Sequence, residues 1–404
     1  GGFVSVFYLS GSGGGFGKEE SMRLFWMELY KLLRRKAFLA GLFGALAILL
    51  LYFCVGIVGE ERSTINGKLY TGWEAVRMDR AVTEEFRGTL SDETVGRIIE
   101  KYGFPSQVEE GYGGFRDENY CNGFITEYLG NGWFRDWDDY RISTSLKPID
   151  ESELGQTAEK KGEGFFFAYA RGWAVLLDTL QLGMILGSVL LIVELSPIYA
   201  EEHQTGMAAL LFTCRDGREK DIAIKTAAAF TLAALVYGMI VSAAFLAVGL
   251  VYGFDGAKCM SGMVTAQHAV NPFYAISMEP VFRFVSLVLT LDLLAIFVLC
   301  AVILCVSAHA AQSFHAVIMS GILWIAPLLI RMLFGGPGYL LAAGTPLFLI
   351  MYGILEDWYN MLFLPVSIAL GTGIGCVVNG FCTVRTSEPG KPFPAGKKLP
   401  DRIG

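Results

Sequence analysis

Residues 284–330 read FVSLVLTLDLLAIFVLCAVILCVSAHAAQSFHAVIMSGILWIAPLLI, and Asp292 is the single Asp, Glu, Lys or Arg in this run. A helix needs about 20 apolar residues to cross the hydrocarbon core of a bilayer. The run is therefore too long for one crossing, and the polar residues His309, Gln312 and His315 interrupt it. The pattern predicts a helical hairpin made of two membrane spans, at 284–307 and 316–334.

The composition of the whole chain agrees with a membrane protein. Of its 404 residues, 53% are hydrophobic and 18% are charged, whereas soluble proteins carry about 25% charged residues. Nearly uncharged stretches predict four further spans, at 37–58, 173–195, 226–252 and 361–384. The formal net charge of −7 gives no electrostatic support to nucleic-acid binding, which needs a basic surface.

Residues 335–357 are apolar but broken. Gly335-Gly336-Pro337-Gly338 interrupts their start and Pro346 their middle, so the unbroken part is marginal in length for a crossing. We expect a re-entrant or interfacial segment here, before the last span. The predicted fold class is thus an all-α integral membrane protein with six transmembrane helices.

Lys and Arg collect on one side of this predicted topology. They are frequent in 22–36, 196–225 and 385–404 and rare in the alternate short loops. Because basic flanks stay in the cytoplasm, both termini and the 196–225 loop are expected there, and residues 60–170 are expected outside.

The polar segment 60–170 is predicted to be a mostly helical extracytoplasmic domain. Two helices are expected, at 74–87 and 91–101, with Ser91 as the N-cap of the second and Gly103 at its end. Residues 111–141, rich in Gly, Trp, Tyr and Asp, are expected to form loops.

The first residues differ from the rest of the chain. Lys18-Glu19-Glu20 stands just before Met22, and a purine-rich bacterial ribosome-binding sequence encodes this triplet when it is read in frame. We therefore interpret 1–21 as a translated, disordered leader, and we expect the protein in a bacterial plasma membrane. Residues 22–36 place apolar and basic residues on opposite faces, which is typical of an amphipathic helix in the membrane interface.

The sequence contains none of the enzyme motifs that we sought. It has no Walker A loop, no His-Glu-x-x-His and no Gly-x-Ser-x-Gly, and its eight cysteines include no Cys-x-x-Cys. We therefore expect no catalytic residue, no metal site and no directly bound cofactor. A disulfide between Cys121 and Cys259 is left open.

Three ionisable residues within the predicted spans are candidates for a translocation path: Asp178, Asp292 and Arg331. A carboxylate inside a bilayer is costly and faces protein or water. Asp178 is close enough to the outer surface to reach water, whereas Asp292 is deeper and either pairs with Arg331 or lines a substrate path. Gly183-x3-Gly187 and Gly371-x3-Gly375 predict close helix packing.

The loop at 196–225 reads SPIYAEEHQTGMAALLFTCRDGREKDIAIK. Together with Met22, Glu28 and Lys31, it resembles the permease subunits of ABC-2 type ATP-binding-cassette exporters. In the loop, the resemblance rests on the ordered residues Glu201, Glu202, Thr205, Gly206, Leu210, Leu211, Gly217, Arg218, Lys220 and Lys225. One branch of that family also has a large external domain between spans one and two.

This resemblance implies that the loop docks on a separate ATPase subunit, which would hold ATP and Mg²⁺. The implied ATPase-coupling residues are Glu201, Glu202, Gly206, Arg218 and Lys225. A second permease subunit, identical or different, and the lipid bilayer are the other implied partners, and the exported cargo would be amphiphilic, peptide-like or drug-like. The alternative is an ATP-independent membrane protein, either a secondary transporter or a receptor or assembly protein that uses its external domain.

Overall fold

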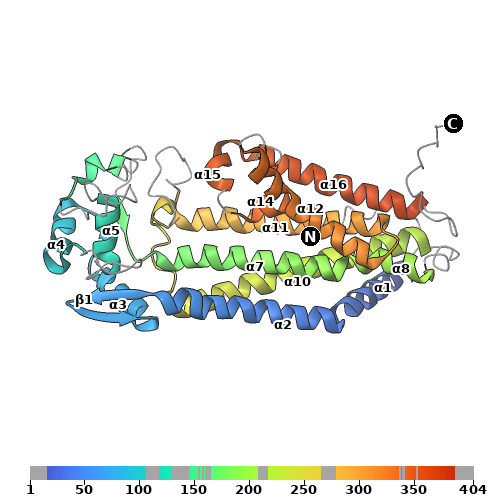
Figure 1. Ribbon diagram of the computed structural model, residues 1–404, viewed down its shortest axis with the longest axis horizontal. Helices are drawn as coiled ribbons and strands as arrows, with labels where there is room; N and C mark the ends of the chain where they lie inside the picture. The colour runs from blue at the N-terminus through green and yellow to red at the C-terminus, as the bar shows by residue number, and fades with distance from the viewer. Residues whose placement is uncertain are drawn as a thin grey trace, which may run out of the picture.

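The structure is a computed structural model, and it describes residues 16–105, 118–129, 145–152, 155–156, 159, 165–207, 217–264, 279–335, 338, 342–351 and 354–386. Among these residues, six helices are long and apolar enough to cross a membrane, which fits the predicted multi-span helical membrane protein. Most of them lie along the long axis of the molecule (Figure 1). The six helices are α2 (Lys36–Leu51), α7 (Arg171–Leu195), α10 (Gly217–Val251), α11 (Val281–His309), α12 (Ser313–Phe334) and α16 (Phe363–Thr386).

The ends of these helices lie within about one turn of the predicted spans, with one exception. The first span extends beyond α2 through a π-helical turn, Tyr52–Ile57, and a 3₁₀ turn, Val58–Glu60. The exception is α10, which begins at Gly217 rather than near 226. Its charged first turns continue the membrane helix because Asp221 and Lys225, four residues apart, form an ion pair along one face.

The N-terminal helix α1 covers Phe16–Leu33. Residues 16–21, predicted to be disordered, are therefore helical, and Met22 is not a structural boundary; residues 1–15 lie outside the described residues. Leu29 and Leu32 are buried, and α1 packs against α10. Whether the natural chain starts at Met22 stays a prediction.

The polar segment between Glu61 and Ala170 forms a small unit, here called the polar domain. Asn66 and Gly67, with φ of 52° and 75°, make the tight turn of a hairpin that the sequence analysis missed. A helix also occupies part of the predicted loop at 111–141, so that prediction is wrong for 120–129. The elements are β1 (Arg62–Ile65), β2 (Lys68–Thr71), α3 (Trp73–Glu85), β3 (Gly88–Thr89), α4 (Asp92–Tyr102), α5 (Tyr120–Leu129), a 3₁₀ turn (Ile149–Glu151) and β4 (Phe166–Phe167).

Local sequence signals explain the bounds of α4. The hydroxyl of Ser91 accepts a hydrogen bond from the Thr94 amide at 3.2 Å, which confirms the predicted N-cap. Gly103 ends the helix with a φ of 70°, a conformation that glycine adopts without steric cost.

A buried carboxyl ties three elements of the polar domain together. Asp79, on α3, accepts hydrogen bonds at Oδ1 from the Ser63 hydroxyl of β1 at 2.6 Å and from the Tyr120 amide of α5 at 3.1 Å. Burial raises the pKa of Asp79 to about 6, against the lowering effect of these two hydrogen bonds. The domain therefore contains a carboxyl group whose pKa is raised from 3.8 to about 6.

A broken segment was predicted at 335–357, and the part of it that the structure describes includes the short helices α14 (Pro346–Ile350) and α15 (Ile354–Trp358). Pro346 occupies the first turn of α14, where its missing amide hydrogen costs nothing. Leu347, Phe348, Leu349 and Ile350 are all buried, and α14 packs against α7, α11 and α12. The remaining described elements are the short helix α8 (Pro197–Thr205) and two 3₁₀ turns, Ser261–Met263 and Tyr359–Met361.

Candidate coupling site

The short helix α8 (Pro197–Thr205) follows the membrane helix α7 directly. Pro197 favours a helix start, and Gly206 ends the helix in the left-handed conformation with a φ of 72°. Figure 1 places α8 and α1 at one end of the helix bundle and the polar domain at the other. The segment that resembles a coupling loop is thus at the opposite end of the molecule from the polar domain.

A serine of α11 anchors the first turn of α8. The Ser307 hydroxyl accepts hydrogen bonds from the amides of Tyr199 and Ala200, at 3.0 and 3.3 Å, and donates to the Ser196 carbonyl at 2.6 Å. The first amides of a helix have no partner within the helix, so this buried hydroxyl satisfies groups that would otherwise be unpaired. It also fixes the start of α8 to the end of α11.

A buried ion-pair cluster joins α8 to α10. The Lys225 ammonium contacts Glu202 of α8 and, at 2.5 Å, Asp221 of its own helix. Its side chain is only 2% exposed, whereas those of the two carboxylates are 22% and 26% exposed. Removing one member of a buried ion pair leaves a charge without compensation, so the cluster holds α8 against α10.

Arg35 makes a second set of ion pairs at the start of the first span. Its guanidinium lies 3.4 Å from a carboxylate oxygen of Glu194 on α7 and 3.2 Å from one of Glu201 on α8. Glu194 is buried, whereas the Glu201 side chain is 56% exposed. Through Arg35, α8 is therefore also linked to α2.

The structure places the five predicted coupling residues in different surroundings. Glu201, Gly206 and the neighbouring Met207 are exposed, whereas Glu202 and Lys225 hold α8 to α10. Arg218 lies in the first turn of α10, and its side chain is outside the described residues, as are all of 208–216. The docking role of the five residues stays a prediction.

Sequence reasoning missed three residues of this site: Arg35, Asp221 and Ser307. Asp221 could have been found, because it stands four residues before Lys225 in a predicted helix. Arg35 could not, because Glu194 and Glu201 follow it by 159 and 166 residues, and no local pattern joins groups so far apart.

The predicted translocation candidates lie apart from α8. Asp178 is on the exposed side of α7, and the Arg331 guanidinium lies 5.5 Å from the centre of the Phe348 ring. Asp292 is buried within the bundle, and neither of its carboxyl oxygens has a hydrogen-bond partner. A pair between Asp292 and Arg331 is therefore not present in this arrangement.

Two ion pairs join the polar domain to α7 and to the loop after α10, at the ends of these helices that lie away from α8. Glu61 Oε1 accepts hydrogen bonds from Arg171 Nε at 3.1 Å and from the Tyr252 hydroxyl at 3.0 Å. Arg80 Nη2 lies 2.8 Å from Asp255 Oδ2. Arg171 begins α7 and Tyr252 follows α10, so these two helices connect the polar domain with the α8 end.

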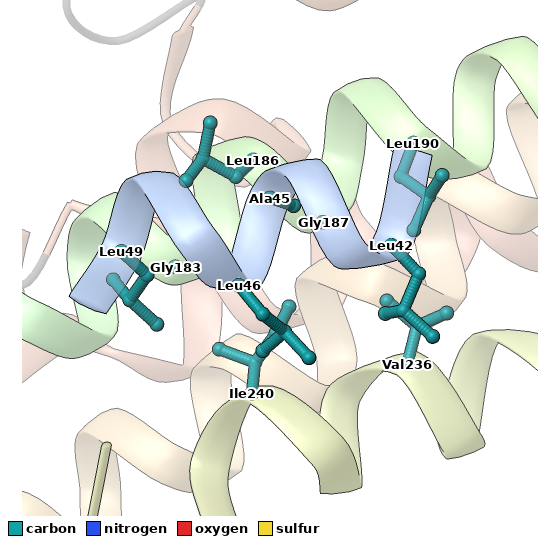
Figure 2. Close-up of a pocket in the computed structure, with 10 residues that line it drawn as sticks. All are labelled: Leu42, Ala45, Leu46, Leu49, Gly183, Leu186, Gly187, Leu190, Val236 and Ile240. Carbon is teal, nitrogen blue, oxygen red and sulfur yellow. The ribbon is translucent and has the colours of Figure 1, made fainter. Parts of the chain in front are cut away.

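A narrow apolar crevice lies between α2, α7 and α10 (Figure 2). A Cβ added at Gly183 or Gly187 would lie 2.5 Å from a side-chain carbon of Ile240, which confirms the close packing predicted for this motif. At Gly371 and Gly375 a Cβ would meet no atom within 4 Å. The close packing predicted for Gly371-x3-Gly375 is therefore wrong for the described residues. The crevice offers no polar group to orient a ligand.

The disulfide that was left open is not present, because Cys121 and Cys259 are both free cysteines. Cys121 Sγ lies 3.6 Å from the Thr83 hydroxyl and Cys259 Sγ lies 3.9 Å from the Ala168 carbonyl. Burial raises the pKa of each thiol to about 12, so neither is reactive at neutral pH. Within the described residues, no three His, Cys, Asp or Glu side chains could hold a metal ion.

Comparisons with known proteins found no family model, no curated protein and no solved structure that matches the chain. Its function has to be inferred from the geometry of its own residues.

Proposed function

We propose that the chain is the permease subunit of an ATP-driven exporter, and that α8 receives the force of a separate ATPase subunit. The observation that carries this proposal is the anchoring of α8. It is bonded to α10 through Lys225, to α11 through Ser307 and to α2 and α7 through Arg35. Any displacement of α8 would therefore move four membrane helices together.

In this proposal, the contact residues and the positioning residues are different groups. Glu201, Gly206 and Arg218 touch the ATPase, while Glu202 and Lys225 keep α8 in place on α10. The ATPase supplies the ATP and Mg²⁺ sites, because this chain has no Walker A sequence. The cargo is amphiphilic, peptide-like or drug-like and moves outward between two permease subunits.

The proposal includes an orientation in the membrane. The basic flanks of the spans face the cytoplasm of a bacterial cell, so α8 and both termini are cytoplasmic and the polar domain is extracytoplasmic. Helix α1 lies in the inner membrane interface. The short helices α14 and α15 enter the membrane from the outer side without crossing it.

The test is capture of the partner ATPase from native membranes by the purified chain. Glu201→Lys should reduce the captured ATPase and ATP-driven export while the chain still inserts. Glu84→Lys is a matched control, because Glu84 is 63% exposed and also pairs with an arginine at 3.2 Å, but in the polar domain. Equal capture by the two variants would contradict docking at α8.

Labelling from one side of the membrane tests the orientation independently. A cysteine introduced as Met207→Cys, in a chain with the exposed Cys54 and Cys382 changed to serine, should react with a membrane-impermeant maleimide in inside-out vesicles alone. Reaction in right-side-out vesicles would overturn the proposal.

One observation favours the alternative of an ATP-independent transporter, namely the buried Asp292, because secondary transporters use carboxyl groups at membrane depth. An ion gradient that drives cargo movement in vesicles without any nucleotide would select that alternative. A requirement for ATP would exclude it.

A further inference from the structure

Asp292 lies on a face of α11 that is otherwise apolar. Val288, Leu291, Ala295 and Leu299 are buried on the same face of the helix. Asp292 itself is 1% exposed, and both of its carboxyl oxygens are buried without a hydrogen-bond partner. Buried polar groups in proteins are nearly always paired, so an unpaired one calls for an explanation.

One polar group that interacts with Asp292 comes from α10. The Tyr237 hydroxyl interacts electrostatically with Asp292 but donates its hydrogen bond to the Leu289 carbonyl of α11, at 2.8 Å. Leu289 stands three residues before Asp292, which is about one helical turn. A tyrosine donor is therefore present beside the carboxyl group and is bonded to the backbone.

Charged groups on the other helices around α11 are engaged elsewhere. On α7, Asp178 lies on the exposed side and Glu194 pairs with Arg35. Arg331 of α12 lies over the Phe348 ring, and Arg385 of α16 pairs with Glu219. The described residues of α14 carry no charge. Within the described residues, no cation is a hydrogen-bond partner of Asp292.

An ionised carboxylate in these surroundings would be strongly unfavourable, because it loses its hydration without gaining a counter-charge. A neutral carboxylic acid costs much less to bury. We propose that Asp292 is a proton-binding site, which is loaded when α10 and α11 pack as in this structure and is emptied when they separate.

The proton balance of this step is simple. When the two helices separate, water reaches the carboxyl group, the O–H bond breaks, and the proton passes to that water and leaves a carboxylate. Because one proton is released on opening, the ratio of open to packed molecules rises about tenfold per pH unit at pH values where the packed state holds the proton and the open state does not.

This site does not depend on the ATPase partner, so it can be tested on the purified full chain in lipid nanodiscs. Infrared spectroscopy should show the C=O band of a protonated carboxyl at neutral pH, and the band should disappear in Asp292→Asn. Asp79→Asn is the control, because it removes a different buried carboxyl, in the polar domain. A spectrum unchanged by Asp292→Asn would overturn the proposal.

A second measurement follows the separation of the helices. Spin labels at the exposed positions Leu246 on α10 and Phe282 on α11 report the distance between them as pH is raised, in a chain without reactive native cysteines. The wild type should open with rising pH and Asp292→Asn should stay packed, since asparagine mimics the neutral acid. Asp292→Glu should restore the response.

The same pH response in wild type and Asp292→Asn would overturn the proposal. If Asp292→Asn does not fold, Asp292→Glu still decides, because it must keep both the acid band and the pH-dependent distance. Loss of ATPase capture in the experiments on α8 would leave these results unaffected, so the two proposals fail separately.

Discussion

Replacing Asp79 by asparagine should stabilise the polar domain at neutral pH. Burial raises the pKa of Asp79 from 3.8 to about 6, and one pKa unit corresponds to about 1.4 kcal/mol. The shift of about two units amounts to about 3 kcal/mol of stability. Because the pKa is raised in the folded state, this stability is fully present below pH 3.8 and is lost as pH rises through about 6.

Asparagine keeps what the structure requires at this position. Its amide oxygen can accept the same two hydrogen bonds, from the Ser63 hydroxyl and the Tyr120 amide. It has no charge to bury, so its stability should not depend on pH. At about pH 8, Asp79→Asn should therefore exceed the wild type by up to about 3 kcal/mol, and below the pKa of 3.8 the two should be equal.

The assay is native-state hydrogen exchange of the full chain in detergent, read at the amides of α3 and α5 and corrected for the intrinsic pH dependence of exchange. These two helices meet at Asp79, so their local opening free energy reports the group directly. Parallel pH profiles for the wild type and Asp79→Asn would refute the reasoning. Ser63→Ala, which removes one hydrogen-bond donor but keeps the carboxyl, should retain the pH dependence.

Three further predictions concern the helix bundle. Gly187→Ala should lower stability in thermal unfolding by about 1–3 kcal/mol through overpacking, whereas Gly375→Ala, which meets no atom within 4 Å, should be neutral or stabilising. Gly206→Val should cost about 1–2 kcal/mol because its backbone is left-handed, and Gly206→Asn should cost less; equal losses would contradict a backbone role. Lys225→Met should cost about 3–5 kcal/mol in denaturant unfolding, and adding Glu202→Gln should recover part of that loss by removing one uncompensated carboxylate.

The number and place of the spans could be predicted from the sequence because they depend on local composition. Crossing a bilayer requires a continuous run of apolar residues, and the run at 284–330 shows both its length and its polar interruption directly. The cap of α4 was predictable for the same reason, since Ser91 and the Thr94 amide are three residues apart.

Predictions from local sequence failed where the same sequence pattern is compatible with two different structures. Gly183-x3-Gly187 and Gly371-x3-Gly375 look alike in sequence, but among the described residues only the two glycines of the first motif face a neighbouring helix. The segment at 120–129 was predicted as loop because it lies in 111–141, a stretch rich in Gly and Asp, which favour turns. It is helical because its aromatic side chains pack with Phe165 and Phe167, which come from a distant part of the chain.

The sequence by itself determined that this is a multi-span helical membrane protein, because the length of each apolar run depends only on residues that are neighbours in the sequence. Only the tertiary structure decided which charges meet: Arg35 with Glu194 and Glu201, Lys225 with Glu202, and Asp292 with no partner. A buried charge is stable only beside a counter-charge or as a neutral group. Which of these applies depends on residues brought together by packing, not on spacing along the chain.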